Sequence, residues 1–454
     1  MNKVIFFLIA SCVPLFVYGK EQSIIPADGK IDQSCTTAEI KSDEPLSFAV
    51  KVSAEKKTKK NILLALVGPM EPTFIELADI IKKDLEFSGA LSVVVRSFGM
   101  LSSKADVTAL AKEGYELAIF FNATNNSREV EWRVYDTDQS AMIKGSKYSY
   151  KGQVKRGWAH NIADIVWQVV TGNQGFFSTK IAYCKDIHSP RKRKVMHVYI
   201  ADYDGSNEQL LVSNPTVNVA PRWNNDVVNP LLFYSEYTNS NVRLIAVNME
   251  KKRKVASNFD GINMLASFSG DGKQVIYCAS QGKGSCQLHY YEKGQLKKLT
   301  DNKGNNISPT FSADGKKVFF CSDFQTGQPQ IYCLDVEKKS IDRLTTGGYC
   351  ASPSYSATQN AVAYARIEKG IMQLFLYDAG KATHTQLTFD AEHKEECCWS
   401  PSGDFILFSC ELKGKSRIAM MNIHTKERKY ITSDKMICSY PAWSPVYEAF
   451  PVVG

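Results

Sequence analysis

The chain lacks the short motifs that mark most enzymes and metalloproteins. It contains no Gly-x-Gly-x-x-Gly, no complete Gly-x-x-x-x-Gly-Lys-Ser/Thr phosphate loop, no Gly-x-Ser-x-Gly and no His-Glu-x-x-His. Its cysteines include no Cys-x-x-Cys pair and no downstream His-x-His set, which disfavours structural zinc. We therefore predict no catalytic residue, no cofactor and no metal ligand. An enzyme with a site in a central pocket is the alternative, and it would need converging titratable groups with shifted pKa values.

Long apolar runs are also scarce. After residue 19 no window holds the roughly 20 apolar residues that a membrane span needs. Residues 1–19 have the form of an export signal, with Lys3, an apolar run from Val4 to Val17, and Gly19 at the expected cleavage site. A lipoprotein signal ending at Cys12 is the alternative, which leaves open whether this cysteine carries a lipid.

The net charge of +8 is modest and comes largely from three basic runs, at residues 56–60, 191–194 and 251–254. We interpret these runs as solvated turns. An anionic surface, such as lipid headgroups or nucleic acid, is the alternative.

Cysteine is frequent for an exported chain. Loss of the signal leaves eleven of the twelve cysteines, so at least one thiol stays free in a monomer whose other cysteines pair. Cys321 and Cys333 are the predicted pair, because they lie symmetrically about Gly327 and would face each other across a hairpin.

The most informative pattern is a repeat. Six aromatic residues, each followed by a polar turn and an apolar strand, recur at spacings of 45, 43, 44, 44 and 44 residues. They are Trp223, Phe268, Phe311, Tyr355, Trp399 and Trp443. A period in the forties with several short strands per unit is typical of a propeller with four-stranded blades. We interpret Ser312–Gly315 as a blade turn; the Asp-box of sialidases is the alternative, but its Thr-Trp ending is missing.

The last repeat is incomplete, because only eleven residues follow Trp443. In the other repeats the aromatic residue ends an inner strand and further strands follow, and in four of them the fourth strand carries Leu-Thr or Ile-Thr. The missing strands are predicted before the first marker, at Lys180–Cys184, Met196–Tyr203 and Glu208–Val212. The C-terminal strand is therefore expected to close a ring of six blades, which removes exposed strand edges.

The residues before the ring have a different pattern of apolar residues, which predicts a small α/β domain. Ile62–Val67 reads as a buried strand, Pro72 begins a helix that ends before Gly89, and a second long helix stops at Gly172. Further strands are predicted at Leu91–Val95, Leu117–Phe121 and Val130–Tyr135. The predicted organisation is a signal peptide (1–19), a flexible tail (20–45), an α/β domain (46–175) and an all-β six-bladed propeller (176–454).

One segment concentrates possible ligands. His393–Cys398 reads His-Lys-Glu-Glu-Cys-Cys and precedes Trp399. We interpret it as a solvated loop, with a metal site or a disulfide as alternatives. Adjacent residues on a strand point to opposite faces, which disfavours convergence on one ion.

Three stretches resemble a known family. They are Phe-Ser-Thr-Lys-Ile-Ala-Tyr at 177–183, Ala-Asp-Tyr-Asp-Gly at 201–205 and Tyr-Pro-Ala-Trp-Ser-Pro at 440–445. With the α/β domain and six repeats, the chain is similar to the TolB family of the Tol-Pal envelope system from residue 46 to about 447. The resemblance implies a non-enzymatic periplasmic scaffold that supports outer-membrane integrity and cell division.

In that family the propeller binds the peptidoglycan-associated lipoprotein Pal through loops that enter the inner strands, and the N-terminal segment contacts TolA. The resemblance thus implies a monomer with a Pal-type partner, with TolA and other Tol proteins as further partners, and with no nucleic acid. The implied contact residues are Asn305, Asn306 and Ile307, whose loop resembles the family's Asn-Asn-Thr-Glu-Pro, and Ile262, Asn263 and Leu265 in the neighbouring blade. The segment 20–45 is longer than the family's usual one. A structural partner of another exported complex is the alternative.

Overall fold

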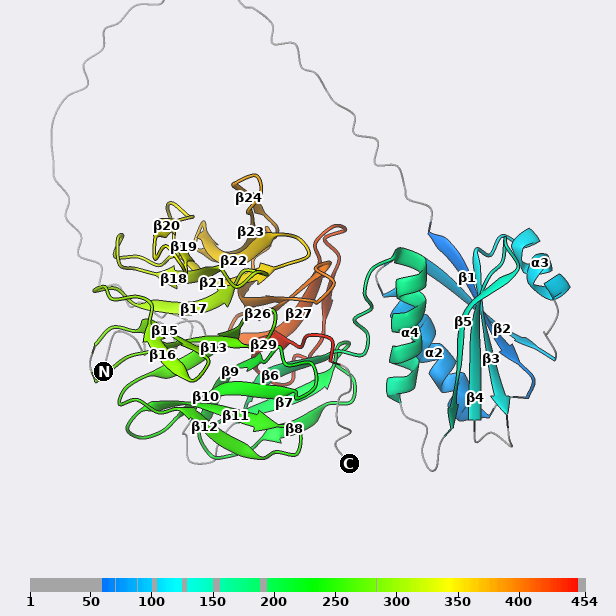
Figure 1. Ribbon diagram of the computed structural model, residues 1–454, viewed down its shortest axis with the longest axis horizontal. Coiled ribbons are helices and arrows are strands. Elements are labelled where there is room, and N and C mark those ends of the chain that lie inside the picture. Colours follow the sequence, from blue (N-terminus) through cyan, green and yellow to red (C-terminus); the bar gives the residue numbers. More distant parts are fainter. Residues whose placement is uncertain are drawn as a thin grey trace, which may run out of the picture.

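The computed structural model describes residues 59–69, 71–87, 89–99, 104–124, 129–149, 156–187, 194–282 and 284–447. Figure 1 shows a small α/β domain, blue to green, beside a larger ring of strands. The predicted signal peptide and tail lie outside the described residues. Within the described ranges, none of the helices combines the length and apolar character of a membrane span.

The α/β domain is built on one five-stranded sheet in the order β2-β1-β3-β4-β5. Its strands are β1 (Lys60–Val67), β2 (Leu91–Phe98), β3 (Leu117–Thr124), β4 (Glu129–Asp136) and β5 (Ala141–Ser149). The pairs β1–β2 and β1–β3 are parallel, and the other two are antiparallel. Helices α2 (Pro72–Glu86) and α4 (Arg156–Thr171) lie between this sheet and the propeller, and α3 (Lys104–Lys112) lies on the other side (Figure 1).

The all-apolar β1 is explained by burial on both faces. Ile62, Leu64 and Leu66 belong to the core that contains α2 and α4, whereas Leu63 and Ala65 pack with residues of α3. A strand covered on both faces reads as a continuous apolar run instead of an alternating one. The predicted strands and both long helices of this domain are confirmed.

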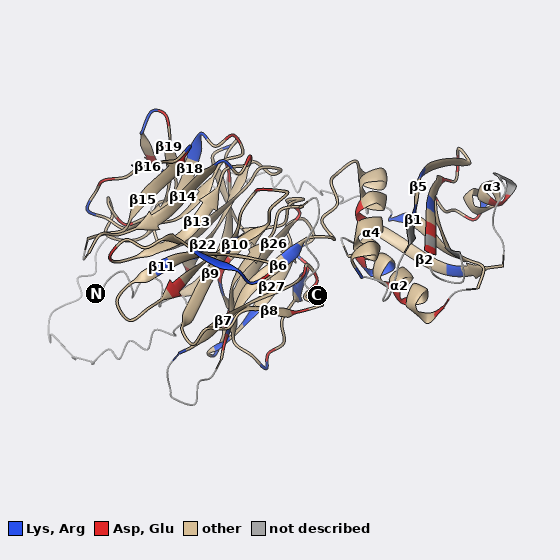
Figure 2. Ribbon diagram, turned by 60° about the horizontal axis from the view of Figure 1, so that its bottom comes forward, with Lys and Arg blue, Asp and Glu red and all other residues tan. Residues whose placement is uncertain are grey.

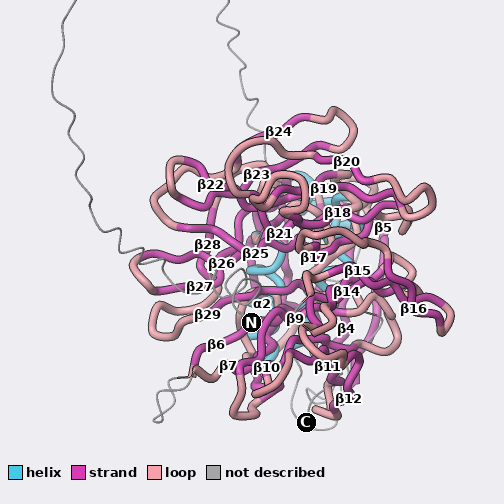
Figure 3. Tube along the Cα trace, turned by 90° about the vertical axis from the view of Figure 1, so that its left-hand side faces the viewer, coloured by secondary structure: helices cyan, strands magenta, loops and turns pink. Residues whose placement is uncertain are grey.

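The ring consists of six antiparallel four-stranded blades, with the inner strands near the middle of Figure 3. The strands are given from the inner strand outward. The first two blades are β9 (Val217–Trp223), β10 (Leu231–Tyr237), β11 (Val242–Asn248) and β12 (Arg253–Ser257), and then β13 (Asn263–Phe268), β14 (Gln274–Ala279), β15 (Gln287–Glu292) and β16 (Gln295–Lys298). The next two are β17 (Asn306–Phe311), β18 (Lys317–Ser322), β19 (Gln330–Asp335) and β20 (Ile341–Arg343), and then β21 (Cys350–Ser356), β22 (Ala361–Glu368), β23 (Ile371–Asp378) and β24 (Thr383–Gln386). The last two are β25 (His393–Trp399), β26 (Phe405–Leu412), β27 (Lys415–Asn422) and β28 (Arg428–Tyr430), and then β29 (Cys438–Trp443), β6 (Lys180–Asp186), β7 (Met196–Asp202) and β8 (Gln209–Val212).

The ring closes as predicted. The C-terminal strand β29 pairs with β6, with Trp443 opposite Ile181. The backbone N–H of Ser444 extends this pairing by donating to the Lys180 carbonyl at 2.8 Å. One blade therefore contains strands from both ends of the propeller sequence, which leaves no open edge between the first and last repeats.

In four of the six blades a repeated Leu-Thr or Ile-Thr pair closes the outer edge. Leu344 N donates to the Ile331 carbonyl at 2.8 Å, and Thr345 Oγ1 accepts from Ile331 N at 2.9 Å. The same two bonds recur at Leu299-Thr300, Leu387-Thr388 and Ile431-Thr432. The pair follows the fourth strand and ties it to the third.

Every inner strand contains a bulge. At each one the ladder shifts register, and one non-glycine residue takes a φ of 52–57°. These residues are Ala220, Leu265, Ser308, Ser352, Glu396 and Tyr440. Such bulges re-aim the side chains that follow them, here at the wall of the central channel.

The predicted disulfide between Cys321 and Cys333 is wrong. Both cysteines carry free thiols, and Cys321 lies opposite Ile331 whereas Cys333 lies opposite Phe319. The β18–β19 hairpin is therefore centred one residue before Gly327, which places the two cysteines diagonally. Burial raises the pKa of the Cys333 thiol to about 11.

Charge on the surface is mixed. Figure 2 shows Lys and Arg (blue) and Asp and Glu (red) scattered over both parts of the molecule, with no large block of one sign. The basic run at residues 251–254 is exposed, as predicted for a turn, and continues from the turn after β11 into the start of β12. Its charges are not all solvated, because Arg253 pairs with the buried Glu236 at 2.5 Å and Lys252 pairs with Glu250 at 2.8 Å.

Candidate functional site

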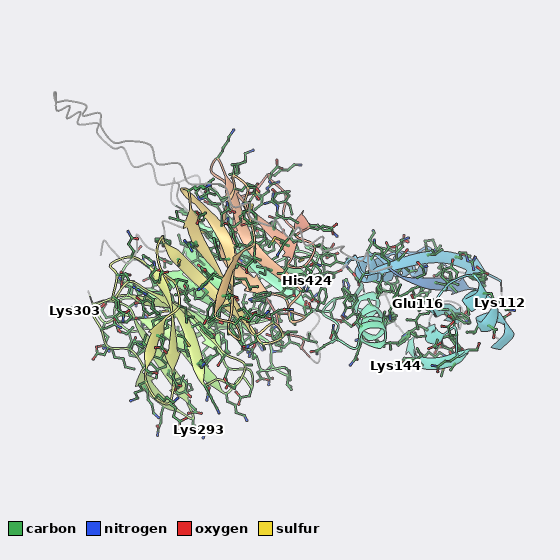
Figure 4. All side chains as sticks on the ribbon, turned by 90° about the horizontal axis from the view of Figure 1, so that it is seen from above. Lys112, Glu116, Lys144, Lys293, Lys303 and His424 are labelled. Carbon is green, nitrogen blue, oxygen red and sulfur yellow. The ribbon has the colours of Figure 1, made fainter. Side chains whose placement is uncertain are left out.

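The loops that lead into the inner strands form one end of the ring, here called the loop face. They comprise residues 213–216, 258–262, 299–305, 344–349, 387–392 and 431–437. In Figure 4, Lys303 of one such loop lies at the far end of the propeller from the α/β domain, whereas His424, in a turn at the opposite end of a blade, lies on the domain's side. The α/β domain therefore leaves the loop face open.

Asn306 lies inside the loop face and not on its surface. Its side chain is fully buried, and Nδ2 donates to Gln287 Oε1 at 3.0 Å and to Asn302 Oδ1 at 3.1 Å. Ile307 is also buried, in the propeller core. Asn305 is partly exposed, and its Oδ1 accepts from the backbone N–H of Cys286.

The neighbouring blade repeats this arrangement. Asn263 is fully buried, and its Nδ2 donates to the carbonyls of Val242 at 2.9 Å and Phe259 at 2.8 Å. Leu265 is a buried bulge residue, and Ile262 is partly buried against the core. Of the six residues that the sequence predicted, only Asn305 and Ile262 reach the surface. The two buried asparagines hold the loops in shape.

The two buried asparagines occupy the same position of the repeat, two residues before the bulge residue, here called the tethering position. Across the six blades the residues at this position are Asn218, Asn263, Asn306, Cys350, Lys394 and Cys438. Asn218 again donates to a backbone carbonyl, that of Met196 at 2.8 Å. Lys394 is fully buried; its Nζ pairs with the Asp390 carboxylate and donates to the Glu392 carbonyl at 2.6 Å. A charged side chain therefore does in one blade what an amide does in three others.

The interpretation of His393–Cys398 as a solvated loop is wrong. These residues form most of the inner strand β25, and Lys394, Glu396 and Cys397 are buried. His393 is the first residue of β25, and its Nδ1 accepts a hydrogen bond from Met372 N at 3.3 Å. Among the residues that the structure describes, no three His, Cys, Asp or Glu side chains gather as a metal site would require.

The loop face carries four exposed apolar side chains, here called the apolar row. They are Phe389, Ile367, Leu412 and Met436, with 77%, 38%, 41% and 37% of their surface exposed. Phe389 and Met436 lie in loops that enter inner strands, and the other two end second strands at the same end of their blades. Sequence reasoning missed this row, because single apolar residues in loops and at strand ends do not form a periodic pattern.

The loop that presents Phe389 is firmly held. Gln373 Nε2 donates to the Asp390 carbonyl at 2.6 Å. Glu392 accepts from the Tyr430 hydroxyl at 2.8 Å and pairs with Arg428 at 2.7 Å. Together with the Lys394 contacts, these bonds fix the backbone that carries the exposed Phe389 side chain, so this loop is ordered without a partner.

The comparisons with known proteins identify the family. A family model described as the TolB beta propeller domain matches residues 167–447, more than half of the chain. This chain belongs to the TolB beta-propeller family. The matched residues begin in α4 and include the whole propeller up to Tyr447.

Individual relatives are also named TolB. The chain is 28% identical over 362 residues to "Tol-Pal system protein TolB" of Francisella tularensis subsp. mediasiatica, covering 76% of this chain and 80% of that one. A protein with the same name from Gluconobacter oxydans is 29% identical over 212 residues, and this match spans about half the length of that relative, 46%. The crystal structure of TolB from Acinetobacter baumannii shares the fold, with a TM-score of 0.71 at 22% identity over 85% of this chain and 97% of that one.

Proposed function

We propose that this chain is a non-enzymatic periplasmic scaffold of the Tol-Pal envelope system. In this role it binds the lipoprotein Pal through the loop face and supports outer-membrane integrity and cell division. Membership of the TolB family and the names of the relatives support the system. The apolar row on a preformed, unobstructed face is the observation that carries the binding surface. TolA and other Tol proteins are the further partners, and the chain would reach the membrane through them.

The energetics favour Phe389 as the centre of the surface. An aromatic side chain that is 77% exposed leaves most of its apolar area in water. Covering such a side chain with a partner is among the largest single contributions to binding, especially when the chain around it is already ordered. Asn305 and Ile262, the two predicted residues that reach the surface, then lie on the same face in other blades.

The test is calorimetric titration of the chain with the soluble domain of Pal from the same organism. Phe389→Ser removes the exposed ring without opening the core, and Val228→Ser is the matched control. Val228 is 61% exposed and lies in the turn after the inner strand β9, at the other end of the ring. Asn306→Arg would be a poor probe, since it places a guanidinium in a fully buried amide site and changes folding as well as binding.

We expect saturable binding that Phe389→Ser weakens at least tenfold, about 1.4 kcal/mol, and that Val228→Ser leaves unchanged. Absence of binding by the folded wild-type chain would remove Pal as the partner. Equal affinity of the wild type and Phe389→Ser would move the contact away from the apolar row.

A further inference from the structure

The central channel contains a cavity of about 280 Å³ at the end where the inner strands finish. Its wall includes all six repeat aromatics and the first residues of the turns behind them, such as Gly270, Ala313 and Ala357. The cavity therefore lies toward the end of the ring opposite the loop face. It is separate from the surface proposed for Pal.

One ring of positions in this wall is occupied by small residues in five blades. These are the residues immediately before the repeat aromatics: Ser267, Thr310, Ser354, Cys398 and Ala442. In the sixth blade the same position is Arg222. The long cationic side chain of Arg222 thus lies where the equivalent positions of the other five blades have small side chains. The cavity lies beside these small side chains.

The charge of Arg222 has no counter-charge in the wall. Among the described residues, no Asp or Glu lines the cavity and Arg222 forms no ion pair. Its Nη1 donates to the carbonyl of the adjacent Pro221 at 2.8 Å. Burial raises the pKa of the Cys398 thiol to about 12, against the opposing effect of Arg222, so this thiol stays neutral at pH 7. A partly buried guanidinium facing hydroxyls, thiols and rings is a poor arrangement for water-free packing.

We propose that the channel cavity is a binding site for a small oxyanion, held by the Arg222 guanidinium. The ligand class is a small molecule bearing a carboxylate or phosphate. The planar guanidinium donates two parallel hydrogen bonds to either group, which is the strongest form of this contact. Ser267, Thr310 and Ser354 add hydroxyl donors from the neighbouring blades, and the surrounding rings contact an apolar body if the ligand has one.

Two probes distinguish the sources of the anion. Benzoate carries a carboxylate on a ring that the aromatic wall would contact, and inorganic phosphate carries charge alone. Benzamide, which has the shape of benzoate without its charge, is the neutral control. Each is titrated calorimetrically into the full chain, into Arg222→Gln, and into Arg343→Gln. Arg343 is an exposed arginine on β20, outside the channel, and controls for unspecific attraction of anions.

We expect benzoate or phosphate to bind the wild type and Arg343→Gln with one-to-one stoichiometry, and Arg222→Gln to lose at least tenfold in affinity. Benzoate binding without phosphate binding identifies an organic acid site, and the reverse identifies a site for free phosphate. Binding of neither anion by the wild type, equal binding by Arg222→Gln, or equal binding of benzamide and benzoate would each overturn the proposal.

A second variant guards against misfolding of Arg222→Gln. Ser267→Asp keeps the arginine and places a carboxylate at the neighbouring position of the same ring. This internal anion would compete for the guanidinium, so we expect anion binding to disappear while the melting temperature stays at or above that of the wild type. Retained anion affinity in folded Ser267→Asp contradicts a site at Arg222.

Discussion

The hydroxyl of Tyr203, on the propeller, donates a 2.8 Å hydrogen bond to Oδ1 of Asp84, on helix α2. The other carboxylate oxygen of Asp84 lies 2.7 Å from Nδ1 of His160, on α4, and all three side chains are buried. Around them Phe87 contacts the rings of Tyr203 and Phe405 at 5.0 and 5.1 Å between centroids. One apolar core therefore extends from the α/β sheet into the propeller, with a polar contact at its centre.

Removing the Tyr203 hydroxyl should weaken this junction. Tyr203→Phe keeps the ring and deletes a buried hydrogen bond to a carboxylate, a change that costs about 1.5–3 kcal/mol of unfolding free energy. Urea denaturation measures it. Tyr355→Phe is the control, because the Tyr355 hydroxyl bonds Asn360 in an exposed setting. Equal losses in the two variants would show that the junction does not depend on this bond.

Stability should fall on the alkaline side because of His160. Burial alone lowers its pKa, but hydrogen bonds and charge from Asp202 and Asp84 outweigh burial and raise it to about 9. A histidine with a raised pKa stabilises the fold fully below its unfolded value of about 6.5, and this contribution is lost as the pH rises through about 9. We expect the wild type to lose up to about 3 kcal/mol relative to His160→Gln between these pH values. Parallel stability profiles for the two proteins would contradict this prediction.

The repeat could be predicted from sequence because its cause is local and periodic. Trp443 has the same spacing as the other aromatics, and the shortfall after it is what predicted the closing pair with β6. In the α/β domain, α3 and β5 were missed. Every residue of β5 from Ala141 to Lys147 is exposed, so this part of the strand has no buried face to produce an alternating pattern.

The candidate site was harder to predict, because its residue types do not reveal burial. Asn306 is a polar residue in a loop sequence, which favours exposure, yet its amide satisfies backbone and side-chain groups inside the fold. Phe389 is an apolar residue in a loop, which favours burial, yet it is exposed. Both are inversions of the usual rule, and both depend on contacts between distant strands that no local pattern records.

The Leu-Thr pair that ties the fourth strand of a blade to the third predicts that a near-isosteric change at its threonine lowers stability. Thr345→Val keeps the shape of the side chain but leaves the buried Ile331 N–H without its hydroxyl acceptor, at a cost of about 1–3 kcal/mol. Thr326→Val, in an exposed loop of the same blade, is the control. Thermal or urea unfolding should separate the two, and a Thr345→Val protein as stable as its control would show that the repeated threonine does not close the blade.

Lys394 offers the sharpest test of the tethering position, because three other blades have an asparagine there that donates to backbone carbonyls. Its buried ammonium satisfies the Glu392 carbonyl and the Asp390 carboxylate, and Lys394→Met removes both of these contacts at once. Since Asp390 is partly exposed and can be solvated, the expected loss is about 1–3 kcal/mol instead of the larger penalty for an isolated buried charge. Lys394→Asn should recover part of it, since an amide at this position donates to backbone carbonyls in three other blades.

The same pair of variants connects stability to the proposed function. The bonds of Lys394 hold the loop that presents Phe389, so Lys394→Met should also weaken Pal binding, whereas Lys394→Asn should recover part of the binding and part of the stability together. If Lys394→Met binds Pal as the wild type does while unfolding more easily, the loop does not need this tether to present its aromatic side chain, and rigidity of the loop face is not what the buried lysine provides.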